Sequence, residues 1–231
     1  MSGRLGSPIQ RVERCESTQL LLGAADPEGA VAVADVQTAG RGRLGRAWVA
    51  PPGTALLCSV LLRPPAGSRI AQLSLVGGLA AAQTVEAALG RAAQLKWPND
   101  VLVDGLKVAG VLAEARDGVV VLGIGLNVNQ AAGELPPEPR VAAASLRTLD
   151  GATRDRDAIL EALLDRLEAA YDAWLAGGLP ALHRELAARD ALAGRVVGID
   201  GRRERALGID EEGRLLLESG AVESGEIALV P

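Results

Sequence analysis

Three consecutive β-strands are predicted by residues 94–129, QLKWPNDVLVDGLKVAGVLAEARDGVVVLGIGLNVN. Two Asp-Gly pairs, at Asp104-Gly105 and Asp117-Gly118, divide this stretch, and Asp-Gly is typical of tight hairpin turns between apolar strands. The strands are expected at residues 94–103, 106–115 and 119–129. The sequence therefore predicts an antiparallel β-meander.

The other elements follow from hydrophobic runs and from turn residues. Over residues 1–188 we predict a strand within 1–16, a helix capped at Ser17-Thr18, strands at 31–36 and 55–62, a helix at 70–89, a loop at 131–140, and a long and then a shorter helix within 155–188. From about residue 195 five short strands with tight turns predict a small SH3-like barrel. The predicted fold class is α+β, with a mixed sheet and packed helices over 1–188 and the barrel over 189–231.

The length, net charge and composition of the chain argue against several classes of protein. With 231 residues, a net charge of -5 and a pI near 5.1, the chain is not expected to hold DNA or an anionic membrane by bulk electrostatics. Cys15 and Cys58 lack the spacing of a metal site, and His183 is predicted to be a helix-surface residue. The chain has no leader pattern and no apolar run of roughly 18 residues, so a cytoplasmic location is predicted.

Lysine is used at only two of the 24 basic positions, Lys96 and Lys107, and all the others are arginines. A lysine ammonium is a compact point charge, whereas the guanidinium of arginine is a planar fork. Two retained lysines eleven positions apart therefore indicate a site where an ammonium meets an oxyanion. The alternative is that drift in composition left them there by chance.

The segment Gly40–Arg46, GRGRLGR, alternates flexible backbone with three arginines and is followed by Trp48. Glycine allows main-chain N–H groups to approach an anion. An arginine guanidinium can donate two parallel hydrogen bonds to the oxygens of one phosphate or carboxylate. We interpret this segment as a loop that closes over an anionic ligand. The alternatives are an RGG-like nucleic-acid segment and a solvated loop.

The last strand of the meander alternates glycine and asparagine with apolar residues. Its period of two places Gly123, Gly125, Asn127 and Asn129 on one face. Glycine inside a strand is unfavourable unless something approaches closely, so this face is predicted to hold a flat ligand. A bulge or a barrel bend is the alternative.

Lys96-Trp97-Pro98-Asn99-Asp100 ends with an amide and a carboxylate. Asn99 and Asp100 could hold Mg²⁺ together with waters and a nucleotide phosphate, although Pro-Asn-Asp is also an ordinary turn. Lys107 and Gly110 are three positions apart, so in a regular strand they would lie on opposite faces of the sheet. They can face the same ligand only if the strand contains a bulge between them.

Taken in order, five motifs resemble those of the biotin-protein ligases: Ser17-Thr18-Gln19, the stretch Gln37–Trp48 containing GRGRLGRAW, Lys96–Asp100, Lys107–Gly110, and Gly123–Asn129. Gln19 departs from the family pattern, which has Asn after Ser-Thr. The resemblance implies a class II synthetase-like ligase domain followed by a C-terminal SH3-like barrel. It also implies the ATP-dependent biotinylation of a lysine through biotinyl-5'-adenylate.

The resemblance further implies roles for individual residues. Lys107 and Arg43 would be catalytic, and Asp100 would hold Mg²⁺. The biotin site would comprise Ser17, Thr18, Gln37, Gly40, Arg41, Arg43, Lys107, Gly110, Gly123 and Gly125. The ATP and adenylate site would comprise Arg43, Arg46, Trp48, Lys96, Asn99, Lys107 and Asn127.

The implied acceptor is a biotin carboxyl carrier domain of a carboxylase. Only 16 residues precede Ser17, which leaves no room for a winged helix-turn-helix, so no DNA-binding repressor activity is expected. An exposed strand edge would allow a homodimer. Two alternatives remain, a lipoate- or octanoate-protein ligase with the same sheet architecture, and a non-catalytic nucleotide- or RNA-binding module that uses the Arg/Gly loop.

Overall fold

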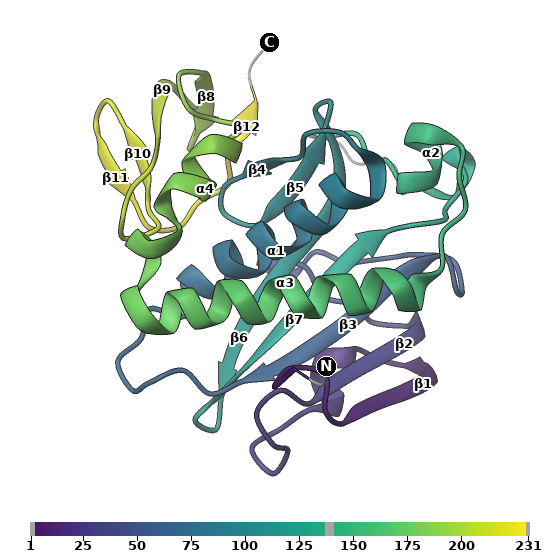
Figure 1. Cartoon of the computed structure of the whole chain (residues 1–231). Helices are drawn as coiled ribbons and strands as arrows, with labels where there is room; N and C mark the ends of the chain where they lie inside the picture. The colour runs from purple at the N-terminus through teal and green to yellow at the C-terminus, as the bar shows by residue number, and fades with distance from the viewer. Residues whose placement is uncertain (1–2, 137–140, 230–231) are drawn as a thin grey trace.

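The computed structural model describes residues 3–136 and 141–229. Its main feature is a seven-stranded mixed sheet with helices packed on one face, beside a smaller sheet built from the C-terminal residues (Figure 1). The strand order is β1-β2-β3-β7-β6-β5-β4; β1 and β2 pair in parallel, and all the other neighbours are antiparallel. The predicted mixed sheet with packed helices is confirmed.

The strands of the main sheet lie close to their predicted positions. Their bounds are β1 Ile9–Cys15, β2 Val31–Gln37, β3 Ala55–Leu62, β4 Gln94–Lys96, β5 Asp100–Val103, β6 Leu106–Arg116 and β7 Val119–Asn127. Asp104 and Asp117 both have positive φ, as do the glycines that follow them, so both Asp-Gly pairs form the tight turns that the sequence predicts.

One predicted strand, residues 94–103, is wrong. This stretch folds into two short strands, β4 and β5, which pair with each other as an antiparallel hairpin. The chain reverses at Trp97-Pro98-Asn99, where Pro98 has no N–H group with which to continue a ladder. Asp100 is thereby placed at the start of β5, next to the end of β4.

The helices cover one face of the sheet. Helix α1 spans Ala71–Leu89 and α3 spans Arg156–Gly177, and the two lie side by side across the sheet in Figure 1. Gly77 of α1 lets this helix approach closely, because an added Cβ would lie 3.0 Å from both Leu122 Cδ2 and Val111 Cγ1. The remaining helical segments are η1 Thr18–Leu21, η2 Arg43–Gly45, η3 Ala132–Glu134, α2 Leu146–Asp150, η4 Leu179–Leu182 and α4 His183–Arg189.

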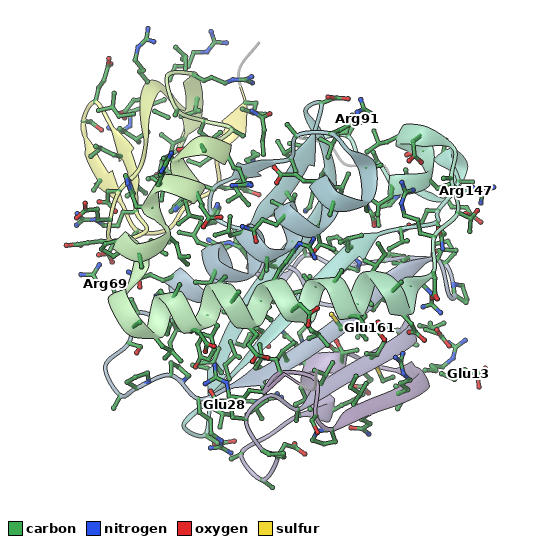
Figure 2. All side chains as sticks on the ribbon, viewed as in Figure 1. Glu13, Glu28, Arg69, Arg91, Arg147 and Glu161 are labelled. Atoms are coloured by element: carbon green, nitrogen blue, oxygen red, sulfur yellow. The ribbon has the colours of Figure 1, made fainter. Side chains whose placement is uncertain are left out.

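Most charged side chains lie outside this packed core, and Lys96, at 8% exposure, is a buried exception among the residues described. Arg69, Arg91 and Glu161 project from the helix-covered side, where acidic and basic groups are intermixed (Figure 2). Arg69 pairs with Glu212 at 3.0 Å. None of the helices in residues 3–136 and 141–229 combines the length and the apolarity of a membrane span.

The capped helix predicted after Ser17-Thr18 is also wrong. One 3₁₀ turn, η1, is formed there, and Ser17 makes no side-chain capping bond. Thr18 instead places its Oγ1 2.8 Å from Ser59 Oγ on the neighbouring β3. The hydroxyl group of Thr18 is therefore turned toward the sheet.

The second sheet has the order β11-β10-β9-β8-β12. Its strands are β8 Val196–Ile199, β9 Arg202–Ile209, β10 Leu215–Leu217, β11 Gly220–Val222 and β12 Ala228–Leu229. The five predicted short strands are present, but β11 and β12 do not pair within the residues described, so no closed barrel is seen. Its apolar residues, among them Val197 and Ala206, join the core cluster of the main sheet.

His183 is not the simple helix-surface residue that the sequence predicts. Its ring is half-buried, and Nε2 lies 3.1 Å from the main-chain oxygen of Ile209 in β9. This contact joins α4 to the second sheet. Across residues 3–136 and 141–229, no group of three or more His, Cys, Asp and Glu side chains is arranged to hold a metal ion.

Candidate active site

A cavity that opens to solvent lies on the sheet face opposite α1. The alternation of side chains along β7 shows which face of the sheet bears the cavity. Leu122 contacts Gly77 of α1, so the alternate residues Gly123 and Gly125 must face away from the helices. Thirteen of the predicted site residues line it: Ser17, Thr18, Gln37, Arg41, Arg43, Arg46, Trp48, Asn99, Asp100, Lys107, Gly110, Gly123 and Gly125. Segments far apart in the sequence therefore meet at one site.

A β-bulge brings Lys107 and Gly110 to the same cavity. Val101 pairs with Ala109, but its neighbour Leu102 pairs with Lys107, so that Val108 is the extra residue on β6. An extra residue reverses the alternation of side chains along a strand. The condition that the sequence left open, a bulge between these two residues, is met.

Lys107 is held by a carboxylate and an aromatic ring. Its Nζ lies 3.1 Å from Asp100 Oδ1, and both side chains are mostly shielded from solvent. The same Nζ lies 5.5 Å from the centroid of the Trp48 ring. Both contacts hold the ammonium within the cavity, where an anion could reach it.

The glycines of the sheet face are covered by side chains of this chain. An added Cβ at Gly125 would lie 2.4 Å from Trp48 Cε2, and one at Gly110 would lie 3.0 Å from Trp48 Cζ3. Gly123 is covered in the same way by Gln19, whose Nε2 would be 2.6 Å away. The bare backbone predicted to receive a flat ligand thus carries an indole ring and an amide in this structure.

A hydrogen-bonded group of polar residues forms one end of the cavity. Gln37 Oε1 accepts hydrogen bonds from the main-chain N–H of Thr18, at 2.7 Å, and from Thr18 Oγ1, at 3.1 Å. Ser17 and Thr18 are both buried. These bonds fix the amide of Gln37 with its oxygen turned toward Thr18, so its Nε2 remains as a donor.

The Gly/Arg loop is a small hairpin over the cavity. Trp48 N donates to Gly40 O at 2.9 Å, and Gly42 N donates to Arg46 O at 2.7 Å. At its tip Leu44 has φ 57 and is 71% exposed. The loop is therefore closed at its base by backbone bonds, with its tip in solvent.

The three loop arginines have different surroundings. Arg41 pairs with Glu114 at 3.5 Å, and Arg46 pairs with Glu226 of the C-terminal region at 3.2 Å. Arg43 makes no ion pair among the residues placed in the structure, and burial together with the neighbouring Arg46 lowers the pKa of its guanidinium, against the opposing effect of Asp100. Arg43 is thus the loop cation left to meet an anionic ligand.

Three predicted site residues lie outside this cavity. Lys96 lines an adjoining cleft, which it shares with Arg43, Lys107 and residues 225–227. Asn127 uses its amide within the protein, because Nδ2 donates to Ala144 O at 3.0 Å and Oδ1 accepts from Gln130 at 2.8 Å. It nevertheless lines a third hollow beside Trp48.

Gly40 is the third of these residues, and its place is at the base of the loop. An added Cβ would lie 2.4 Å from Trp48 O, so this glycine allows the two ends of the hairpin to meet. The same Cβ would lie 2.9 Å from Gln37 Nε2, so Gly40 also lies against a residue that lines the cavity.

Seven lining residues were not predicted as site residues: Gln19, Gly42, Ala47, Cys58, Val111, Leu112 and Ile124. Gln19 was noted only as a departure from a motif, and Gly42 and Ala47 lie within the predicted loop. The two residues from β6, Val111 and Leu112, could be found only from the pairing of β6 with β7. Burial raises the pKa of the Cys58 thiol to about 12, so it is a neutral group in the wall.

The fold and the site define a small-molecule-binding domain, with one sheet face under helices and the other holding a cavity of amides, guanidinium groups and one ammonium. A family model described as "Biotin/lipoate A/B protein ligase family" matches residues 12–130. The chain belongs to this family.

Named relatives agree with this assignment. The chain is 38% identical to a biotin–[acetyl-CoA-carboxylase] ligase of Mycobacterium tuberculosis over 229 residues, covering 88% of this chain and 80% of the relative. It is also 38% identical to a bifunctional ligase/repressor BirA of Bacillus spizizenii over 203 residues, covering 84% of this chain. The chain spans 62% of the length of that relative.

A solved structure shows the same fold over nearly the whole chain. It is described as the biotin protein ligase from Aquifex aeolicus in complex with biotin and ATP, and it superposes with a TM-score of 0.86 at 32% identity. The match covers 96% of this chain and 98% of the other.

Proposed function

We propose that this protein is a biotin-protein ligase, which uses ATP to attach biotin to a lysine of a biotin carboxyl carrier domain. The observation that carries the proposal is the position of Lys107, whose ammonium lies in one cavity with the Gly/Arg loop and the hydrogen-bonded amide of Gln37. Relatives that cover most of this chain are named for this activity, and a structure of the same fold holds biotin and ATP.

The first step joins biotin to AMP. An oxygen of the biotin carboxylate attacks the α-phosphorus of ATP, the bond from that phosphorus to the bridging oxygen breaks, and pyrophosphate leaves. Two anions must approach each other for this reaction, so positive groups near both lower the barrier. Lys107 is the candidate for the ammonium between them, and Arg43 is the candidate for the guanidinium that meets the phosphate.

The second step transfers the biotinyl group to protein. The neutral amine of the acceptor lysine attacks the acyl carbon of biotinyl-5'-adenylate, the bond from that carbon to the phosphate oxygen breaks, AMP leaves, and the nitrogen gives up one proton to solvent. The adenylate must be kept from water until the acceptor arrives. The loop Gly40–Arg46 lies over the cavity and is the candidate for this closure.

The remaining predicted residues would divide between the two ligands. The cyclic urea of biotin would lie near Ser17, Thr18 and Gln37, with Arg41, Gly110, Gly123 and Gly125 around the rest of the molecule. The nucleotide would lie near Arg46, Trp48, Lys96, Asn99 and Asn127. Support comes from the cavity and from the two hollows beside it, which between them contain all of these residues.

Asp100 fits a magnesium ion only in part. Among the residues that the structure describes, it is the one carboxylate lining the cavity, and Mg²⁺ is commonly held by one or two carboxylates together with waters and substrate phosphates. Asp100 would hold the ion once ATP supplies the other oxygens. When bound, Mg²⁺ would neutralise charge on the phosphates.

Other parts of the proposal concern organisation. We retain the division into a catalytic part, residues 1–188, and a C-terminal part, residues 189–231, and we retain the SH3-like assignment for the second sheet. The absence of DNA binding and a homodimer through a sheet edge stay predictions. The net charge of -5 supports the first of these.

The proposed function is tested by pyrophosphate exchange into ATP with biotin, with lipoate or with no acid. Exchange that depends on biotin alone, followed by labelling of a carrier domain on lysine, is the expected result. Exchange with lipoate in place of biotin would make the protein a lipoate ligase. Binding of labelled RNA at moderate salt without any exchange would favour the non-catalytic alternative.

A further inference from the structure

The lysine amines of this chain are confined to one place. Lys96 and Lys107 are its only lysines, and all the other residues of the Lys and Arg set are arginines. Lys107 lines the cavity and shares the adjoining cleft with Lys96. The arginines labelled in Figure 2, Arg69, Arg91 and Arg147, lie on the surface. No lysine side chain of the chain therefore lies outside the site.

Amines and guanidinium groups differ in what they do to an acyl adenylate. In the second step of the proposed reaction, the lone pair of a neutral amine attacks the acyl carbon, the bond from that carbon to the phosphate oxygen breaks, AMP leaves and the nitrogen loses one proton. An arginine guanidinium stays protonated in proteins, and its nitrogens offer no such lone pair. An arginine can therefore bind the adenylate without being acylated, whereas a lysine in the same place would be a competing acceptor.

The loop Gly40–Arg46 is where this difference has the largest effect. Its three arginines, Arg41, Arg43 and Arg46, all line the cavity. An amine tethered at this position would have an effective concentration of the order of millimolar, whatever the concentration of a separate acceptor protein. The loop instead supplies three positive charges to the cavity and no amine.

Both lysines are shielded from solvent. Lys96 is 8% exposed, and the side chain of Lys107 is 15% exposed. Lys107 Nζ forms an ion pair with Asp100 Oδ1 at 3.1 Å. In this ion pair the nitrogen is an ammonium, which has no lone pair with which to attack an acyl carbon.

We infer that this chain is not an acceptor for its own biotinyl-5'-adenylate, because the loop arginines bind the intermediate without reacting and both lysines are withheld from it. This inference rests on the proposed function and adds to it a means of selecting the acceptor. The groups that select are the guanidinium groups of the loop and the ion pair between Lys107 and Asp100. A lysine from outside the chain is then the amine that receives biotin.

The test places one amine at the tip of the loop. Leu44 is 71% exposed and does not line the cavity. Leu44→Lys and Leu44→Arg add the same charge at the same position, but only the lysine can be acylated. Each full chain is incubated with biotin, ATP and Mg²⁺ in the absence of a carrier domain. Mass spectrometry then assigns biotin to individual residues, which distinguishes a lysine from an α-amino group.

We expect residue 44 of Leu44→Lys to carry at least about tenfold more biotin than Lys96 or Lys107. Residue 44 of Leu44→Arg should carry none, and the lysines of the wild type should stay at the level of a control without ATP. Biotin on Lys96 or Lys107 of the wild type would overturn the inference. So would a Leu44→Lys variant that catalyses pyrophosphate exchange and stays unlabelled. If that variant does not catalyse exchange, Val49→Lys, at a position 61% exposed, replaces it with the same expected result.

Leu207→Lys is the matched control for position. Leu207 is 50% exposed and lies on β9, outside the cavity and the adjoining cleft. Its label should be several-fold lower than that on residue 44 of Leu44→Lys. Equal label at the two positions would overturn the role given to the loop.

The N-hydroxysuccinimide ester of biotin separates this inference from the proposed function, because the ester acylates amines without ATP. At an ester concentration that modifies residue 44 of Leu44→Lys, the native wild type should be modified at neither Lys96 nor Lys107. Modification of either lysine would overturn this inference alone. Absence of biotin-dependent pyrophosphate exchange in the wild type would overturn the proposed function, whatever the ester modifies.

Discussion

Lys107 Nζ and Asp100 Oδ1 lie 3.1 Å apart on neighbouring strands, and this pairing exists because β6 contains one extra residue at Val108. In a regular ladder Lys107 and Gly110 would point to opposite faces. With the bulge, the ammonium lies beside the carboxylate and above the bare backbone at Gly110, from which an added Cβ would be 3.6 Å from Lys107 Cε. The charge at the centre of the site therefore depends on a local irregularity of the sheet.

Replacement of Lys107 should stop adenylate formation without unfolding the protein. We expect Lys107→Ala to lower the rate of biotin-dependent pyrophosphate exchange by about a hundredfold to a thousandfold, as for the loss of one group that stabilises developing charge. Lys107→Arg should also be poor, because a planar fork does not replace a point charge. Thermal unfolding serves as the control for folding, and wild-type turnover by the Arg variant would contradict the role of the ammonium.

Asp100→Asn should separate its two proposed roles. Loss of the carboxylate removes the charge partner of Lys107 and the candidate magnesium ligand, so we expect exchange about tenfold slower and a higher Mg²⁺ concentration for half-maximal rate. The matched control is Asp104→Asn in the β5–β6 turn, which lies outside the cavity and pairs with Arg91. An unchanged Mg²⁺ dependence in Asp100→Asn would remove the metal role and leave only the ion pair.

Arg43→Gly should weaken retention of the intermediate. Arg43 is the loop arginine without an ion pair in the described ranges, so its guanidinium is available to the adenylate. We expect the variant to release biotinyl-5'-adenylate and to label amines of a bystander protein several-fold above wild type, measured by streptavidin blotting. Arg43→Lys keeps the positive charge but loses the planar guanidinium, so its bystander labelling should be intermediate between that of wild type and that of Arg43→Gly. Full retention of the adenylate by the Gly variant would argue against closure by this residue.

Gly125→Ala should displace Trp48 from the sheet. The added methyl would lie 2.4 Å from Cε2 of the indole, a distance that real contacts do not reach, so the ring has to move. We expect biotin binding about tenfold weaker by titration, together with a shift in tryptophan fluorescence. Gly133→Ala is the matched control, since nothing lies within 4 Å of its added Cβ and its φ is not positive. Unchanged biotin binding in Gly125→Ala would show that the space above Gly125 is not needed for the Trp48 ring or for the ligand.

The two cysteines should differ in reactivity. Burial raises the pKa of Cys58 to about 12, and it also raises the pKa of half-buried Cys15. Only the thiolate reacts with an alkylating agent, so at pH 8 both react slowly and Cys58 hardly at all. Reaction should increase as the pH rises toward each thiol pKa. Mass spectrometry after iodoacetamide treatment should find Cys15 modified and Cys58 intact, and rapid native labelling of Cys58 would show that the cavity wall opens.

Much of the architecture was readable from local patterns. The Asp-Gly turns, the apolar strand Ala55–Leu62 and the helix ending at Leu89 depend on neighbouring residues, because turn chemistry and side-chain periodicity act over a few positions. The same holds for the motifs, whose residue types identify the ligands they could bind. The predictions of two elements were wrong. Pro98 interrupts the predicted strand 94–103, and the segment after Ser17 forms only one turn in place of the predicted helix.

The sequence by itself determined which residues form the sheet and which side chains could carry the chemistry. Only the tertiary structure decided which of them meet. The bulge at Val108, the indole of Trp48 over Gly125 and the ion pair from Arg46 to Glu226 all join segments that are distant in sequence or depend on strand register. Such contacts are set by packing among several elements at once, and no local pattern along the chain encodes a distance between them.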